Sequence, residues 1–210
     1  MPHTTLPVTS FQQNCSLIWC PSTRRAALID PGGEVDRLLN LAQDVKLDLL
    51  LLTHGHLDHV GAALALSQRL SIPIVGPQVE DAFWLDQLPE QAAQFGFPPT
   101  TAFTPDRWLA DGDVIELGDL RLEVIHCPGH TPGHVVFFNR AEGVAFVGDV
   151  LFAGSIGRTD FPRGNHAQLV DCIRNRLFPL GDDIVFVPGH GPDSTFGRER
   201  QTNPYAGERA

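Results

Sequence analysis

The chain has 210 residues, which is enough for one domain of good size, or at most two small ones, around a buried core. Its hydrophobic fraction of 42% and charged fraction of 19% are those of a globular protein and not of a disordered one. The formal net charge of −10 argues against nucleic-acid binding, which needs a basic face to displace counterions.

The first third of the chain alternates predicted strands with predicted helices. Short apolar runs bounded by turn residues are typical of strands, and apolar residues three or four positions apart are typical of helices. The predicted strands cover 16–19, 26–29, 49–52 and 72–75, and the predicted helices cover 35–46 and 60–70. The segment 80–105 is less regular, and we interpret it as one or two helices that cover a cleft.

The second half is richer in predicted strands. These lie at 114–117, 120–125, 135–138, 144–147 and 184–187, with a helix at 167–177 before the last of them. Alternation followed by consecutive strands predicts an α/β sandwich, in which two sheets face each other and helices lie outside.

The N-terminal residues, the apolar segments and the cysteines bear on where in the cell the protein is located. The first residues lack a basic start followed by an apolar run, and no apolar segment approaches about 18 residues, so neither a signal peptide nor a membrane span is predicted. The four cysteines show no Cys-x-x-Cys spacing, which favours reduced, buried thiols and a cytoplasmic location.

The sequence 54–59, His-Gly-His-Leu-Asp-His, holds four side chains able to bind metal within six positions, directly after a strand. Core packing does not explain this cluster, because buried polar groups are costly unless they are partnered. Imidazole and carboxylate together suit zinc, iron or manganese. Three further strand ends carry the same residue types, at His130, Asp149 and His190.

Counting these side chains indicates how many ions they hold. A catalytic zinc ion takes about three protein ligands and leaves one position open, so seven candidates are too many for one ion. We predict two divalent ions bridged by Asp149, most simply zinc, with iron or manganese as alternatives. His54, His56 and His130 would hold one ion, and Asp58, His59 and His190 the other.

Other polar residues near these motifs are given supporting roles. His126 and His134 flank His130 and are expected to orient the site without binding metal. Arg158 and Arg163 follow the Asp149 strand and are candidates to bind a substrate carboxylate with two parallel hydrogen bonds. A salt bridge to Asp160 is the competing interpretation for these arginines.

The motif His-x-His-x-Asp-His, followed by Pro-Gly-His-Thr, Gly-Asp and a late Pro-Gly-His, resembles the metallo-β-lactamase superfamily over nearly the whole chain. The resemblance implies a four-layer αβ/βα sandwich in a single domain, residues 1–210. It also assigns Asp30, in an Asp-Pro-Gly-Gly turn, to orienting the histidines that bind metal.

Within the superfamily, the segments 13–20, 52–63, 126–138, 157–164 and 203–205 resemble short bacterial hydroxyacylglutathione hydrolases of the glyoxalase II type. The resemblance implies hydrolysis of S-lactoylglutathione to glutathione and D-lactate by a metal-bound hydroxide, with Asp58 orienting the nucleophile. Only twenty residues (210 − 190) follow His190, so the helical extension that binds glutathione in longer relatives is expected to be absent.

Several alternatives stay open at this point. A persulfide dioxygenase shares the Gly-Arg-Thr-Asp-Phe stretch but uses a single iron ion, and a lactonase or another acyl hydrolase needs the same metals. A non-catalytic binding module would not need all seven ligands. The sequence does not determine the native metal, the preferred acyl group or the oligomeric state.

Overall fold

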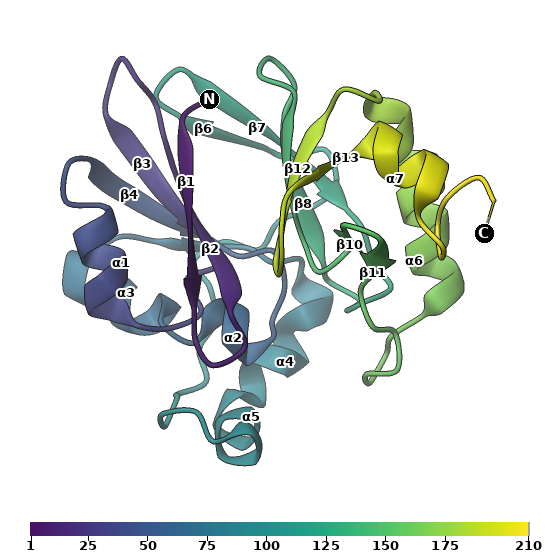
Figure 1. The fold of residues 1–210 in the computed structure, drawn as a ribbon. Coiled ribbons are helices and arrows are strands. Elements are labelled where there is room, and N and C mark those ends of the chain that lie inside the picture. The colour runs from purple at the N-terminus through teal and green to yellow at the C-terminus, as the bar shows by residue number, and fades with distance from the viewer. Residues whose placement is uncertain (210) are drawn as a thin grey trace.

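The computed structural model describes residues 1–209 and has two β-sheets facing each other, with helices on both outer faces (Figure 1). The first sheet has the strand order β1-β2-β3-β4-β5. Its strands are β1 (His3–Val8), β2 (Gln13–Trp19), β3 (Arg25–Ile29), β4 (Lys46–Leu51) and β5 (Ile74–Val75). Strands β1, β2 and β3 pair antiparallel, whereas β3, β4 and β5 are parallel.

Short helices follow the strands of this half and cover its outer face. They are α1 (Val35–Leu41), α2 (Leu57–Val60), α3 (Ala63–Leu70), the 3₁₀ turn η1 (Val79–Asp81), α4 (Ala82–Asp86) and α5 (Leu88–Phe95). Helices α4 and α5 lie at the lower edge of the sandwich in Figure 1.

The second sheet has the order β13-β12-β9-β8-β7-β6, in which β12 and β9 are parallel and the other neighbours antiparallel. Its strands are β6 (Val114–Leu117), β7 (Leu120–His126), β8 (Val135–Asn139), β9 (Val144–Gly148), β12 (Val185–Pro188) and β13 (Ser194–Thr195). The remaining elements are the hairpin β10 (Leu151–Phe152) and β11 (Ser155–Ile156), helix α6 (His166–Cys172), the π-helical turn η2 (Ile173–Leu177), the 3₁₀ turn η3 (Phe178–Leu180) and α7 (Phe196–Thr202).

Three hydrophobic clusters fill the three spaces between the four layers. In β3, Leu28 packs under the helices while Ile29 packs between the sheets. In β8, Phe137 faces the first sheet and Phe138 faces the second helical layer. Because successive side chains of a strand point to opposite faces, strands buried on both sides read as continuous apolar runs. The predicted four-layer αβ/βα fold is confirmed.

Some predicted boundaries were wrong. The helix predicted over 35–46 ends at Leu41, because Lys46 already pairs with Arg25 in the parallel β3–β4 register. The helix predicted over 60–70 is divided at Gly61, where a Cβ would lie 2.6 Å from the carbonyl oxygen of Gly32.

Other elements differ in extent or were not predicted. The strand predicted over 72–75 is reduced to Ile74–Val75, and helix in the segment 80–105 stops at Phe95. Helix α6 ends at Cys172 and continues as the π-helical turn to Leu177. Strands β1, β10, β11 and β13 and helix α7 were not predicted.

All four cysteines are free and buried. Within residues 1–209, no helix combines the length and apolar character needed to cross a membrane.

Candidate metal centre and cavity

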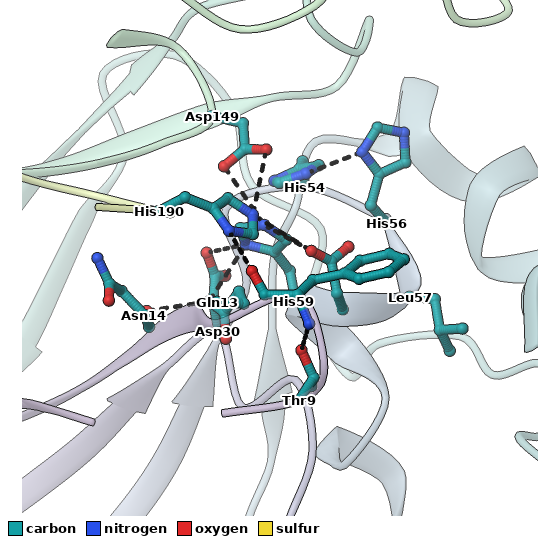
Figure 2. Close-up of polar contacts among 12 residues, drawn as sticks. Thr9, Gln13, Asn14, Asp30, His54, His56, Leu57, His59, Asp149 and His190 are labelled. Atoms are coloured by element: carbon teal, nitrogen blue, oxygen red, sulfur yellow. Dashed lines mark hydrogen bonds and ion pairs between the residues drawn. The ribbon is translucent and has the colours of Figure 1, made fainter. Parts of the chain in front are cut away.

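The sequence-predicted ligands meet at one edge of the sandwich because each follows a strand that ends there. The segment 54–59 follows β4, His130 lies between β7 and β8, Asp149 follows β9 and His190 follows β12. In Figure 2 the side chains of His59, Asp149 and His190 point toward one another, although they come from distant parts of the chain.

The first triad consists of His54, His56 and His130, and all three side chains are buried. Nδ1 of His56 lies 3.1 Å from Nε2 of His54 and 3.0 Å from Nε2 of His130. Nitrogen atoms bound at about 2.0–2.1 Å to one tetrahedral ion would be roughly 3.3–3.4 Å apart. The three ring nitrogens are therefore spaced as ligands of a single ion.

The second triad consists of Asp58, His59 and His190. Oδ2 of Asp58 lies 3.2 Å from Nε2 of His190 and 3.7 Å from Nε2 of His59. The three candidate ligand atoms lie within 4.8 Å of one another, close enough to surround a second ion.

Asp149 lies between the two triads. Its Oδ2 is 3.6 Å from Nε2 of His130 and 3.8 Å from Nε2 of His190, and its Oδ1 is 3.3 Å from Nε2 of His59. Within the described chain, Oδ1 of Asp149 and Nε2 of His59 are buried without a hydrogen-bond partner. Such unpaired buried atoms are costly, and a cation between them would satisfy both.

Outer groups fix four of the histidines with Nε2 facing the centre. In each of the four, Nδ1 has a partner outside the triads, which sets the tautomer and the ring orientation. The partners are Oγ1 of Thr53 for His54 (3.0 Å), Oδ2 of Asp30 for His59 (2.9 Å), the carbonyl of Arg158 for His130 (2.7 Å) and the carbonyl of Phe11 for His190 (3.1 Å).

Asp30 is buried beneath this centre and connects it to the first sheet (Figure 2). Its Oδ1 accepts a hydrogen bond from the backbone amide of Thr53 at 2.7 Å. Its Oδ2 accepts one from the Thr53 hydroxyl at 2.6 Å and faces Nδ1 of His59. The carboxylate thus holds Thr53 and His59, one on either side of the His54–Asp58 stretch.

The electrostatics of the two triads differ. Burial lowers the pKa of His54, His56 and His130, and neighbouring imidazoles lower it further. Burial also opposes charge on His59 and His190, but the adjacent carboxylates of Asp149 and Asp58 outweigh it and raise the pKa of both. These shifts favour the neutral imidazole at His54, His56 and His130 and the charged imidazolium at His59 and His190.

His134 and His126 lie beside the centre and do not join either triad. Nε2 of His134 accepts a hydrogen bond from the backbone amide of Asp149 at 3.1 Å, and its ring stacks on His54 at 4.7 Å. Nε2 of His126 donates to the carbonyl of Pro132 at 2.8 Å, which closes the loop that carries His130.

Asp81 is a buried residue of the site that the sequence interpretation missed. Its Oδ2 accepts hydrogen bonds from the amide of Gly55 at 2.9 Å and the hydroxyl of Thr131 at 2.8 Å. Its Oδ1 accepts one from the amide of Gly133 at 2.6 Å. Burial raises the pKa of Asp81 to about 6, although these hydrogen bonds favour the charged form. One carboxylate thus joins the two loops that supply the first triad, and no motif marks it.

Asn14 holds the last ligand loop against the first sheet. Its amide Nδ2 donates to the carbonyls of Pro188 and Gly191 at 3.0 and 2.9 Å. Its backbone amide donates to the carbonyl of Gly189 at 2.7 Å. The position of His190 is therefore fixed by β2, on the opposite sheet.

A cavity of about 690 Å³ opens onto the metal-binding groups. Its volume is within the range of roughly 300–1,000 Å³ found for small-molecule sites. Aromatic side chains form much of its wall, and both Trp84 and Phe161 pack edge-on against His56. Such walls limit the access of water to the centre.

The two candidate arginines are placed differently. Arg158 lines the cavity, pairs with Asp160 through two contacts of 2.9 Å and lies over the ring of Phe161 at 4.4 Å. Arg163 does not line the cavity, because its guanidinium lies over Phe83 at 4.3 Å. Of the two, Arg158 alone has a place from which it can contact a bound molecule in this cavity.

The fold and the clustered His and Asp side chains fit a hydrolase with a divalent metal site. The metallo-beta-lactamase superfamily model matches residues 8–190. The chain belongs to the metallo-beta-lactamase superfamily, as its motifs predicted.

Similar proteins cover nearly the whole chain. Hydroxyacylglutathione hydrolase GloC of Haemophilus influenzae is 50% identical over 208 residues, 98% of each chain. The solved structure of BLEG-1 B3 metallo-beta-lactamase superposes with a TM-score of 0.89 at 33% identity, covering 98% of this chain and 99% of that one. TTHA1623 in a di-iron-bound form superposes with a TM-score of 0.87 at 34% identity, covering 96% and 99%.

Proposed function

We propose that the protein hydrolyses hydroxyacyl thioesters of glutathione, S-lactoylglutathione foremost, to glutathione and D-lactate in the cytoplasm. The observation that carries this proposal is the cavity, whose wall includes Asp58 and Asp149 together with three of the triad histidines, His56, His130 and His190. Similarity to a hydroxyacylglutathione hydrolase supports the choice of substrate.

Two divalent ions, zinc in our proposal, would be held by the two triads and bridged by Asp149. When bound, such ions supply a water of lowered pKa as nucleophile and polarise a carbonyl group. The position of Asp149 between the triads and the di-iron form of TTHA1623 support this number of ions.

The residues of the chain have separate tasks in this reaction. Asp58 lines the cavity beside His190, so it would help to hold the second ion and orient the attacking water. Trp84 and Phe161 exclude other water molecules from His56. No residue is needed to protonate the leaving group, because a thiol of ordinary pKa near 8.5 leaves as its thiolate.

The test is a substrate panel assayed on protein of measured metal content. The panel contains S-lactoylglutathione, a lactone, a β-lactam, and glutathione persulfide with oxygen consumption recorded. We expect rapid hydrolysis of S-lactoylglutathione at two ions per chain, and its loss in His56→Ala and Asp58→Ala. His166→Ala is the control, because His166 is an exposed residue at the start of α6. Full thioester hydrolysis by metal-depleted protein, or oxygen consumption at one iron ion per chain, contradicts the proposal.

A further inference from the structure

Helix α5 presents a polar face to the cavity. Three exposed residues, Gln87, Glu90 and Gln94, line the cavity. Gln87 is the N-cap of α5, and the other two follow it at positions i+3 and i+7. This spacing places the three side chains on one side of a helix. The opposite side is anchored by the buried Leu88 and Ala92.

Gln91 lies in the same row but is used for structure. Its Oε1 accepts a hydrogen bond from the amide of Leu57 at 3.0 Å, and its Nε2 donates to the carbonyl of Trp84 at 2.8 Å. These bonds fix α5 to the start of α2, next to the metal-binding segment. The polar face is therefore held rigidly beside the reacting centre.

Glu90 is distinguished from the other charged groups that line the cavity. Asp58 and Asp149 belong to the metal centre, and Arg158 is paired with Asp160. Within residues 1–209, the carboxylate of Glu90 makes no hydrogen bond or ion pair. A cavity wall thus carries one unpartnered anion, which is complementary to a cationic group of a bound molecule.

We infer that Glu90 binds the α-ammonium group of the γ-glutamyl residue of the substrate, with Gln87 and Gln94 contacting the neighbouring peptide groups. The inference rests on the proposed function and adds to it how glutathione is selected. Glutathione has one ammonium group, on the γ-glutamyl residue, and its glycyl carboxylate lies at the other end of the tripeptide. Arg158, on the loop after β11, is the cationic group of the cavity that suits the glycyl carboxylate.

The role predicts a specific kinetic pattern. Glu90 would contact a part of the substrate remote from the thioester, so its contribution is the same in the ground and transition states. Glu90→Gln removes the charge with little change of shape. We expect it to raise KM for S-lactoylglutathione about two- to fivefold, as for a charged contact at an exposed site, with kcat unchanged.

A second substrate isolates the ammonium contact. S-lactoyl-N-acetylglutathione has the same peptide but no ammonium group, so wild type and Glu90→Gln should show the same KM for it. Glu116→Gln is the matched control, because Glu116 is an exposed glutamate on β6 that does not line the cavity. Inhibition by the product glutathione provides an independent measure, and its inhibition constant should rise by the same factor in Glu90→Gln.

The outcomes separate this inference from the proposed function. If wild type hydrolyses S-lactoylglutathione but Glu90→Gln has an unchanged KM, or an equal rise in KM for both substrates, the role of Glu90 is refuted and the function stands. If wild type with two ions per chain hydrolyses neither glutathione thioester, both are refuted.

Discussion

Replacing Gly189 by alanine would place a methyl group inside the metal centre. The added Cβ would lie 2.1 Å from Oδ1 of Asp149 and 2.7 Å from Cε1 of His59. The backbone of Gly189 is not in the left-handed region, so alanine is conformationally allowed there and the whole cost is steric. The backbone has little freedom to withdraw, since its amide donates to the carbonyl of Gly148 at 2.8 Å and its carbonyl accepts from Asn14 at 2.7 Å.

The magnitude follows from the overlap. Overpacking of a tight site costs about 1–3 kcal/mol, which corresponds to roughly a 5- to 150-fold change in an equilibrium constant. Because Asp149 is the group that must move, we expect most of this cost to appear as weaker metal binding by Gly189→Ala. Competition with a chromogenic chelator measures the affinity, and thermal unfolding of the metal-free protein measures the part that falls on stability.

Gly33→Ala is the matched control. Its Cβ would meet only the side chain of Thr9, at 2.9 Å from Cγ2, and its backbone is also outside the left-handed region. We expect it to bind metal as wild type does. Equal metal affinity and equal stability for Gly189→Ala and Gly33→Ala would refute the reasoning, because they would show that Asp149 and its neighbours accommodate the methyl group freely.

Three further predictions concern other parts of the site. Asp81→Asn places an NH₂ group opposite the buried amide of Gly55 or Gly133, so one of these amides loses its acceptor. We expect the free energy of unfolding in denaturant to fall by about 1–3 kcal/mol and metal binding to weaken roughly tenfold. Unchanged metal affinity would contradict this. Lowering the pH should release the ion of the Asp58–His59–His190 triad first, because protons compete best where histidine pKa values are raised and worst where they are lowered. Equilibrium dialysis across pH checks this order, and simultaneous loss of both ions would argue against it. Arg158→Gln keeps the backbone carbonyl that orients His130, so we expect a higher KM for S-lactoylglutathione at unchanged metal content, and a fall in metal content would show a structural role instead.

The sequence indicated which His and Asp side chains would lie close together because their signal is local. Each one lies in a short segment that follows an apolar run, and strands that end at one edge bring the segments after them together. The fold class was predictable for a similar reason, since runs such as 49–52 are buried on both faces and have no polar alternation.

What the sequence did not predict depends on contacts between distant segments. The end of α1 is set by the pairing of Lys46 with Arg25, which overrides the helical spacing of the apolar residues. Asp81 has its role through Gly55 and Thr131, which lie 26 and 50 residues away. The sequence predicted a helix covering a cleft in the segment that contains α5. It did not predict which side of this helix faces the cavity, because that depends on the hydrogen bonds of Gln91 to Leu57 and Trp84.

Each triad draws ligands from both halves of the chain: His130 completes the group begun by His54 and His56, and His190 completes the group begun by Asp58 and His59. Bound cations would therefore cross-link the two halves of the chain at the edge where the sheets meet. Neither half contains a complete triad by itself. A ligand that binds only the folded state stabilises it by mass action. Chains without cations should unfold more often and be degraded by proteases sooner. The amount of enzyme that a cell retains should therefore follow its metal supply.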